Sequence, residues 1–92
     1  MKPSDYIRRG WCQFNTALAK DGSYRPAKDG EACQWCLDGA LYVAINGQHN
    51  RKEYLDLYNL IENKLGKDPI KWNDTPGRTQ KEVIAALEAV GL

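Results

Sequence analysis

The sequence has no long run of hydrophobic residues. The longest nearly apolar stretch, residues 37–45, contains Asp38 and is far too short to cross a bilayer. The first ten residues carry charges, and no hydrophobic segment follows them, so we expect no secretory signal. We therefore predict a cytoplasmic protein that does not enter a membrane.

The sequence also lacks an excess of charge of one sign. Thirteen Lys and Arg residues face twelve Asp and Glu residues, which gives a net charge of +1. Proteins that bind duplex nucleic acid usually carry a clustered basic face. The small basic group of Lys2, Arg8 and Arg9 has Asp5 among its members. We therefore expect no binding to duplex nucleic acid.

Signals for a metal site or for catalysis are weak. The glycine-rich phosphate loops GxxxxGK[ST] and GxGxxG are both absent. Cys33-x-x-Cys36, with Cys12 and His49, would supply four zinc ligands, but the pair falls inside an apolar helical pattern. Free cysteine is among the most buried residue types, so we predict core cysteines and no metal or cofactor.

A cysteine nucleophile needs an adjacent base and an electropositive setting. A Cys-His-Asp site would combine Cys12 or Cys36 with His49, the single histidine, and Asp74. Nothing in the spacing brings these residues together. We therefore expect a binding protein rather than an enzyme.

What the sequence does contain is enough for one small domain. It has 92 residues, of which 42% are hydrophobic and 27% are charged, as is usual for a folded soluble protein. We therefore assign residues 1–92 to a single globular domain. Pairing into a homodimer would enlarge the core of so small a domain, although no residue pattern requires it.

Residues 31–46 form the clearest predicted helix. Away from its ends, its polar residues are Gln34 and Asp38, and apolar residues occupy most other positions around the helix. A helix that is apolar on most sides is usually buried, so we expect this one to be central. Gly47 is the expected residue after its end.

Two further helices begin with capping signals. Asn50 precedes a helix that Gly66 ends, and Thr79 precedes the last helix. Glu82 follows Thr79 by three residues, which is the capping-box pattern. The intervening residues 67–77 contain two prolines and are predicted to be a connection.

The N-terminal third allows two structures. Hydrophobic residues between Ile7 and Leu18 follow helical spacing, but Gly10 lies in their midst. Alternatively, a helix ends at Gly10, and Asp21-Gly22 is the turn of a small hairpin. The predicted fold is mainly α, a compact bundle of three to four helices, with a small N-terminal β-hairpin in the second case.

The sequence WNDTPGRT, residues 72–79, is the most distinctive stretch. Asn73 and Asp74 suit a turn, because their side chains bond nearby backbone amides. Arg78 stands beside a helix N-terminus, where backbone N–H groups and the helix dipole favour anions. Arg78 therefore either pairs with Asp74 to clamp the loop or helps to bind an anionic ligand.

Other polar and aromatic residues would complete such a site. Trp11 and Trp72 offer stacking area, and Gln13 is a neutral donor and acceptor. The predicted ligand-binding residues are Trp11, Gln13, Trp72, Asn73, Asp74, Arg78 and Thr79.

Three motifs give the chain a family resemblance: GWCQ (10–13), WCLDGAL (35–41) and WNDTPGRTQKEVIAAL (72–87). The chain resembles a family of small uncharacterised proteins from actinobacteria, other bacteria and their phages. That family has GWCQ-like, CxxGAL and WNDxxGRT motifs in the same order. The resemblance implies a bacterial or phage origin and carries no activity.

We expect a small cytosolic binding protein that recognises a small anionic ligand, with a nucleotide as one candidate, and that sequesters it in a phage setting. The alternative is a protein–protein interaction module, such as a phage inhibitor or adaptor of a host enzyme. Protein interfaces favour Trp, Tyr and Arg. A concave polar pocket around Arg78 would favour the ligand, and an exposed aromatic patch would favour the partner protein.

Overall fold

A computed structural model describes residues 1–45 and 51–92 of the chain. These residues form five helices and three short strands. In chain order they are α1 (Pro3–Arg9), β1 (Ala17–Ala19), β2 (Tyr24–Arg25), β3 (Ala32–Trp35), α2 (Leu37–Val43), α3 (Arg51–Leu65), α4 (Pro69–Asn73) and α5 (Gln80–Ala89). The predicted mainly helical fold is confirmed, and a small antiparallel sheet accompanies it.

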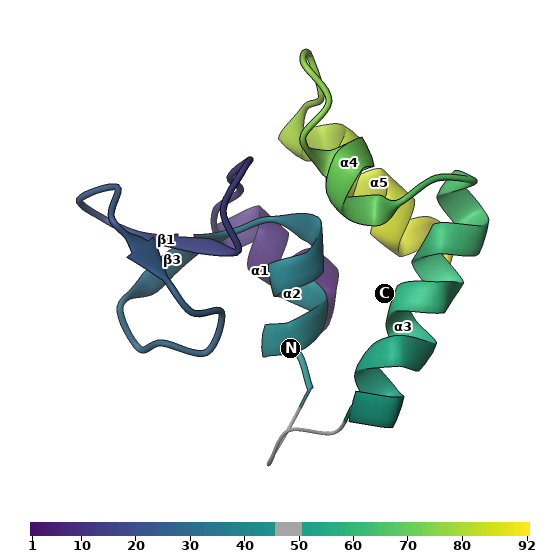
Figure 1. Ribbon diagram of the computed structural model, residues 1–92, viewed down its shortest axis with the longest axis horizontal. Helices are drawn as coiled ribbons and strands as arrows, with labels where there is room; N and C mark the ends of the chain where they lie inside the picture. The colour runs from purple at the N-terminus through teal and green to yellow at the C-terminus, as the bar shows by residue number, and fades with distance from the viewer. Residues whose placement is uncertain (46–50) are drawn as a thin grey trace.

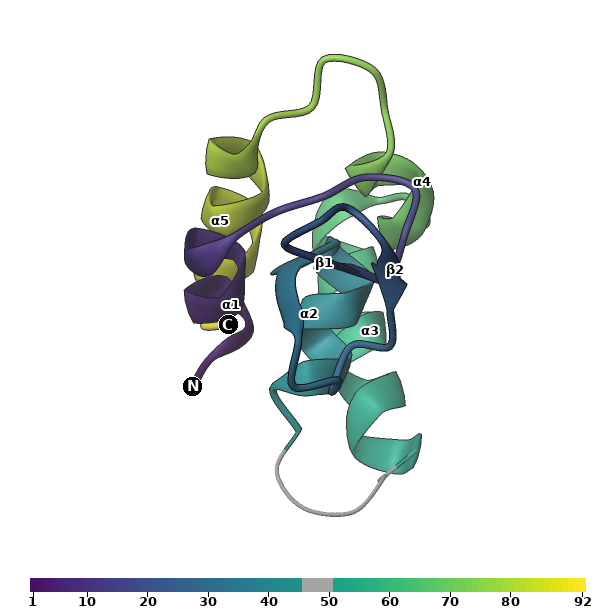
Figure 2. The same cartoon turned by 90° about the vertical axis from the view of Figure 1, so that its left-hand side faces the viewer.

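The helices surround one hydrophobic core (Figure 1). Figure 2 shows α1 and α5 side by side, with both chain ends nearby, while α3 and α4 lie on the far side of α2. The four longer helices each contribute fully buried side chains: Ile7, Leu37, Leu41, Ile61 and Leu87. No described helix is long and apolar enough to cross a membrane.

The N-terminal segment adopts the helix-and-hairpin alternative. α1 ends before Gly10, and the three strands are ordered β2-β1-β3 with both pairings antiparallel. The predicted Asp21-Gly22 turn is present, and the Asp21 carboxylate accepts a hydrogen bond from the Ser23 amide at 2.9 Å. Gly22 has φ of 86°, a conformation that glycine adopts without steric cost.

The predicted helix over residues 31–46 is wrong in its first part. Ala32–Trp35 is β3, which pairs with β1, and α2 begins only at Leu37. Cys36 is the N-cap of α2, with φ of −76° and ψ of 172°, so the chain is extended there. Hydrogen bonds to a distant strand thus override the local helical pattern. The expected helix end at Gly47 lies outside the described residues.

The predicted connection over residues 67–77 contains the short helix α4. The Asp68 side chain accepts a hydrogen bond from the Ile70 amide at 2.9 Å, and Pro69 follows as the first helical residue. Both are recognised helix-start signals. The end of α3 at Gly66 is confirmed, with φ of 69° at that residue. The Asn50 cap lies outside the described residues.

The start of α5 is confirmed in detail. The Glu82 amide donates to Thr79 Oγ1 at 3.2 Å, and the Thr79 amide donates to Glu82 Oε1 at 3.0 Å. This reciprocal pair satisfies two backbone donors that a helix start would otherwise leave open. Val83 and Leu87 follow on the fully buried face of the helix.

Candidate functional site

Asn73, the last residue of α4, has no solvent exposure and uses its whole amide within the fold. Its Oδ1 accepts from Trp11 Nε1 at 2.7 Å and from the Leu37 amide at 3.0 Å. Its Nδ2 donates to the Cys12 carbonyl at 3.2 Å and to Asp74 Oδ1 at 3.0 Å. An amide whose two donors and two acceptor positions are all occupied has none left for a ligand. We call these five residues the Asn73 hub.

Gln13 and the hub residue Asp74 add further hydrogen bonds between the segment of residues 11–16 and residues 73–75. Gln13 Nε2 donates to the carbonyls of Asn73 and Thr75 at 2.9 and 3.1 Å. Asp74 Oδ1 accepts from the Phe14 amide at 2.9 Å, instead of bonding the turn that follows it. The three motifs that carry the family resemblance therefore meet around one buried amide.

Two glycines allow the backbone to approach this region closely. A Cβ atom on Gly39 would lie 2.2 Å from the Thr16 carbonyl oxygen, and one on Gly10 would lie 2.2 Å from the Cys33 carbonyl oxygen. The Cys36 amide also donates to the Thr16 carbonyl at 3.1 Å. Any side chain at Gly39 would therefore push α2 away from the segment of residues 11–16.

Arg78 acts as a clamp, but its partners are not the predicted Asp74. Arg78 Nε donates to the Trp72 carbonyl at 3.0 Å, and the guanidinium carbon lies 3.9 Å from the Trp72 ring centroid. Nη1 pairs with Glu82 Oε2 at 3.1 Å, and the Arg78 side chain is only 16% exposed. Cation–π stacking and the ion pair together hold this arginine in place.

The Glu82 carboxylate occupies the place beside Arg78 and the start of α5 where the sequence predicts an anionic ligand. The Glu82 carboxylate faces Arg78 and also accepts from the Thr79 amide and hydroxyl. Several interactions lower the pKa of Glu82, and the hydrogen bond from the Thr79 amide is the largest of them. Arg78 and the start of α5 thus already share a carboxylate. The predicted anionic ligand stays a prediction.

A small hollow opens where the segment of residues 11–16, the start of α2 and α4 come together. It has a volume of about 120 Å³. Its lining contains two carboxylates and no Lys or Arg: Phe14, Asn15, Thr16, Cys36, Asp38, Ile70 and Asp74. We call it the acidic hollow.

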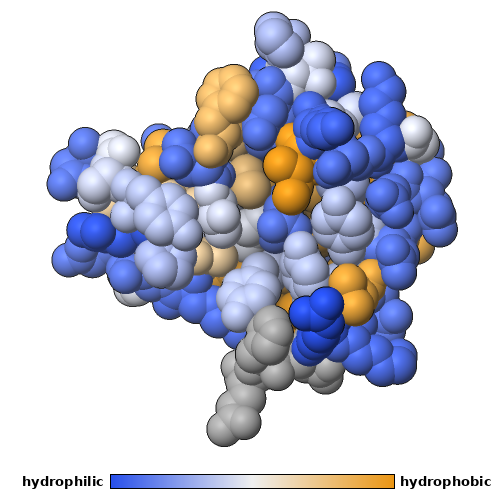
Figure 3. All heavy atoms as spheres, viewed as in Figure 1, coloured by the Kyte–Doolittle hydropathy of each residue, from blue (hydrophilic) through white to orange (hydrophobic). Residues whose placement is uncertain are grey.

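Phe14 and Ile70 form the exposed rim of the acidic hollow. Phe14 is 73% exposed and has φ of 71°, and Ile70 is 42% exposed. The left-handed conformation costs a non-glycine residue about 1 kcal/mol or more. In the view of Figure 3, hydrophobic atoms reach the surface above the middle of the molecule, and hydrophilic atoms surround them. The fold therefore tolerates strain at an aromatic residue that it does not bury.

The two carboxylates are only partly engaged by the fold. Asp38 Oδ1 accepts a hydrogen bond from the Tyr54 hydroxyl, and neither Asp38 nor Asp74 forms an ion pair with a described Lys or Arg. Burial is the largest cause that raises the pKa of Asp38, and the charge of Asp68 adds to it. The hollow is thus negative and lacks a counter-ion from the described part of the chain.

The buried thiols are poor nucleophiles. Burial raises the pKa of Cys12 to about 12 and that of Cys36 to about 11, so both thiols stay protonated near neutral pH. Cys12 Sγ donates to the Asn15 carbonyl at 3.4 Å, and Cys36 Sγ accepts from the Gly39 amide at 3.3 Å. His49, the base of the Cys-His-Asp arrangement, lies outside the described residues. Within the described residues, no three His, Cys, Asp or Glu side chains are grouped to hold a metal.

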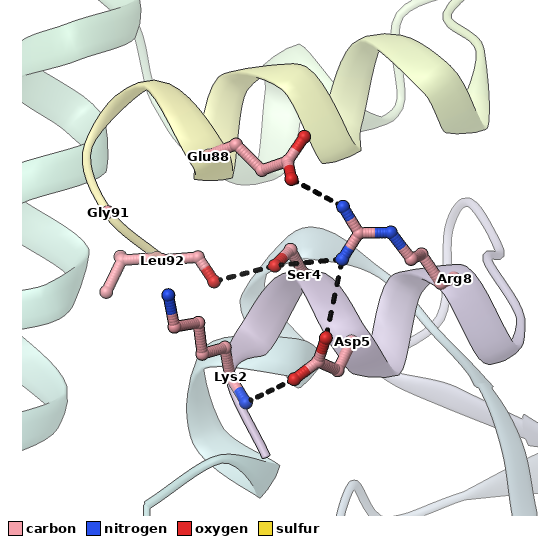
Figure 4. A pocket seen from close by; sticks show the side chains of 7 residues that line it. All are labelled: Lys2, Ser4, Asp5, Arg8, Glu88, Gly91 and Leu92. Carbon is pink, nitrogen blue, oxygen red and sulfur yellow. Dashed lines mark hydrogen bonds and ion pairs between the residues drawn. The ribbon is translucent and has the colours of Figure 1, made fainter.

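A larger hollow, of about 350 Å³, lies where the N-terminal residues and α1 meet the end of α5 (Figure 4). Arg8 points between Asp5 and Glu88 and pairs with both. The Ser4 amide and hydroxyl donate to the Leu92 carbonyl at 3.0 and 2.9 Å. These polar groups bind one another and join α1 to α5, so they offer little to a ligand.

Another open hollow, of about 370 Å³, lies beside the turn between β1 and β2. Its charged lining includes Arg25, which pairs with Glu31 at 2.9 Å. It brings together none of the predicted binding residues. Of the three hollows described, only the acidic hollow contains one of them, Asp74.

Of the lining of the acidic hollow, the predicted binding residues include only Asp74. The sequence predicts a helix or an extended segment around Phe14 and a connection around Ile70. The Asp68-Pro69 pair predicts a helix start at α4, and reading it would have suggested that Ile70 lies on a helix surface. No local signal identifies Phe14, because its position depends on Asp74.

A comparison with protein-family models places the chain in the family of unknown function DUF6197, with residues 4–91 matched. The chain therefore belongs to this family. Comparisons with curated proteins and with solved structures give no match. The family carries no assigned activity.

Proposed function

We propose that this chain is a protein–protein interaction module and that Phe14 and Ile70, the rim of the acidic hollow, are its contact surface. The observation that carries the proposal is Phe14, an aromatic side chain that is 73% exposed at φ of 71°. Aromatic residues are enriched at the centres of protein interfaces. A strained, exposed aromatic side chain contributes little to folding, and binding gives it a role.

The segment that carries Phe14 is held from several sides. The Phe14 amide donates to Asp74, and Gln13 bonds two carbonyls beyond α4. A contact residue that is fixed before binding loses less conformational entropy on association. The hydrogen bonds around Asn73 thus support binding by holding Phe14 in one place.

The size of the acidic hollow favours a protein partner over a small molecule. Pockets for small ligands usually measure roughly 300–1,000 Å³, whereas this hollow measures about 120 Å³. That volume suits the end of one side chain rather than a nucleotide. Arg78 lines none of the three hollows described.

The setting of this proposal follows the family resemblance. A bacterial or phage origin and a cytosolic location both fit a small adaptor or inhibitor of a host enzyme. A domain of 92 residues with one exposed aromatic rim is large enough to block or bridge a partner surface. A second copy of the chain is one partner that the test must identify.

The test is selection from a random library of displayed twelve-residue peptides against the wild-type protein. We expect peptides that bind the wild type and lose binding to Phe14→Asn. The matched control is Tyr24→Asn, because Tyr24 is an aromatic residue on strand β2 that is 58% exposed and does not line the acidic hollow. Selected peptides that bind Phe14→Asn as well as wild type, or a failed selection, would overturn the proposal. Sedimentation of the free protein reports any homodimer.

Native mass spectrometry separates this proposal from an anionic ligand at Arg78. An anion that co-purifies with the wild type and with Arg78→Lys, but not with Arg78→Ala, would favour the ligand. We expect the bare protein mass in all three, because Glu82 already pairs with Arg78.

A further inference from the structure

We infer that the acidic hollow receives an arginine or lysine side chain of the partner, while an adjacent apolar residue of that partner packs on Phe14 and Ile70. The inference rests on the proposed function, because it names the chemistry of the segment that this surface binds. The juxtaposition behind it is an apolar rim around two carboxylates that have no cation from the described residues.

Each carboxylate has one oxygen bound by the fold and one left over. Asp74 Oδ1 accepts from the Phe14 amide and from Asn73 Nδ2, and Asp38 Oδ1 accepts from the Tyr54 hydroxyl. Oδ2 of each aspartate makes no hydrogen bond to the described part of the chain. The hydrogen bonds at Oδ1 hold both carboxylates in place, and we assign Oδ2 of each as the acceptor for the partner's cation.

The surroundings do not neutralise this charge. Besides burial, the groups that shift the pKa of Asp38 are the Tyr54 hydroxyl, which lowers it, and the like-charged Asp68, which raises it. Asp68 itself accepts from the Tyr58 hydroxyl at 3.1 Å. Lys71 acts on Asp68 and is not part of the lining. Burying a carboxylate without a counter-ion is unfavourable, and an arriving guanidinium or ammonium group relieves that cost. An anion would be repelled by both aspartates.

The shape of the site matches a long cationic side chain. Arginine and lysine combine an apolar stem with a charged end, so the stem packs on an apolar rim while the charge reaches a polar interior. The exposed Phe14 ring also favours a cation over its face. The half-buried Asn15 and Thr16, which also line the hollow, add neutral hydrogen-bonding groups.

The experiment uses the selected twelve-residue peptides as probes. We expect Arg or Lys to be enriched next to an aliphatic or aromatic residue. Replacing that basic residue with Gln should weaken binding about tenfold, as measured by titration calorimetry at low salt, which corresponds to about 1.4 kcal/mol. The difference should shrink at high salt, because ions screen a partly exposed pair.

Protein variants test the same contact from the other side. Asp38→Asn and Asp74→Asn keep an oxygen for the hydrogen bonds at Oδ1, so the fold is retained while the charge is lost. We expect each to weaken peptide binding about tenfold, which is the same 1.4 kcal/mol. Asp56→Asn is the matched control, because Asp56 lies exposed on α3 and pairs with Lys52 at 3.0 Å. If Asp74→Asn also moves Phe14, the Asp38→Asn variant alone tests the cation site, because Asp38 bonds Tyr54 and not Phe14.

The outcomes separate this inference from the proposed function. Peptides that depend on Phe14, without basic enrichment and without loss in Asp38→Asn, overturn the cation site and leave the interaction module standing. Peptides that depend on Asp38 but not on Phe14 overturn the proposed surface and retain the cation site. Peptides that depend on neither residue overturn both.

Discussion

Asn73 and Phe14 are treated very differently by the fold, although Asp74 Oδ1 accepts a hydrogen bond from each. Asn73 is polar and fully buried, and every hydrogen-bonding position of its amide is used. Phe14 is apolar, 73% exposed and held in a left-handed conformation. Burial of a polar residue and exposure of an apolar one therefore occur side by side.

The difference leads us to expect that the stability of the fold and the proposed binding depend on different residues. The Asn73 hub joins α4, the start of α2 and the segment of residues 11–16, so it holds the fold together. The position of Phe14 depends on the hub through Asp74, whereas its exposed side chain contributes little to the stability of the fold. Changes at Asn73 should therefore damage stability, whereas changes at Phe14 should damage binding alone.

The largest effect is expected at Asn73. Asn73→Ala would leave the buried Leu37 amide and Cys12 carbonyl and the partly buried Trp11 indole N–H without these partners. Each unsatisfied buried group costs about 1–3 kcal/mol, so we expect a loss of about 3–5 kcal/mol of unfolding free energy. Urea unfolding measures it, with the exposed Asn59→Ala on α3 as control. A loss below about 1 kcal/mol would contradict the hub.

The next largest effect is expected at Gly39, where α2 comes close to the segment of residues 11–16 that carries Phe14. In Gly39→Ala the new Cβ would lie 2.2 Å from the Thr16 carbonyl oxygen, so backbone atoms must move. Overpacking of this kind costs about 1–3 kcal/mol. Gly30→Ala is the matched control, because no atom lies within 4 Å of its Cβ position. Equal thermal unfolding temperatures for the two variants would show that α2 does not need this close approach.

A smaller effect of opposite sign is expected at Phe14. Asparagine adopts the left-handed conformation more readily than phenylalanine, and little packing is lost from a side chain that is 73% exposed. We expect Phe14→Asn to raise the unfolding free energy by about 0.5–1 kcal/mol while it abolishes peptide binding. Urea unfolding provides the measurement. A variant less stable than wild type would mean that the Phe14 ring packs on the fold after all.

The smallest effect is a pH dependence at Asp38. Burial raises the pKa of this carboxyl in the folded state, so wild type loses stability as pH rises from the unfolded Asp value, about 3.9, through the raised folded value. Asp38→Asn does not titrate, so its stability relative to wild type should increase across that window.

Urea unfolding midpoints of wild type and Asp38→Asn, measured from about pH 3 to about pH 7, report this difference in stability. Glu82→Gln is the comparison of opposite sign. The pKa of Glu82 is lowered, chiefly by the hydrogen bond from the Thr79 amide, so wild type gains stability there as pH rises. Parallel profiles for the two variants would contradict this account of Asp38.

Elements with local signals were predicted well. Thr79 and Glu82 specify the start of α5 because their hydrogen bonds span only one helical turn. The Gly66 helix end and the Asp21-Gly22 turn are equally local, and both are present. The spacing in the N-terminal segment allows either a longer helix or a helix followed by a hairpin, and the pairing of β1 with β2 and β3 decides for the second.

Elements that depend on distant partners were not predicted. Residues 32–35 carry apolar side chains at spacing that suits a helix, yet they pair with β1. The binding residues predicted from the sequence do lie around the hub and α4, but the structure gives several of them structural partners. Asn73 is buried, Gln13 bonds carbonyls and Arg78 pairs with Glu82.

The sequence by itself determined the mainly helical class, the cap of α5, the helix end at Gly66 and the Asp21-Gly22 turn. The cap and the two glycine positions rest on contacts within a few residues of the chain. The tertiary structure alone decided that Asn73 becomes a buried hub and that Phe14 is exposed beside two aspartates that form no ion pair with a described Lys or Arg. Those outcomes need residues about sixty positions apart to meet. The packing of α4 against the segment of residues 11–16 brings them together. A pattern within a few residues of the chain cannot predict a contact between residues so far apart in the sequence.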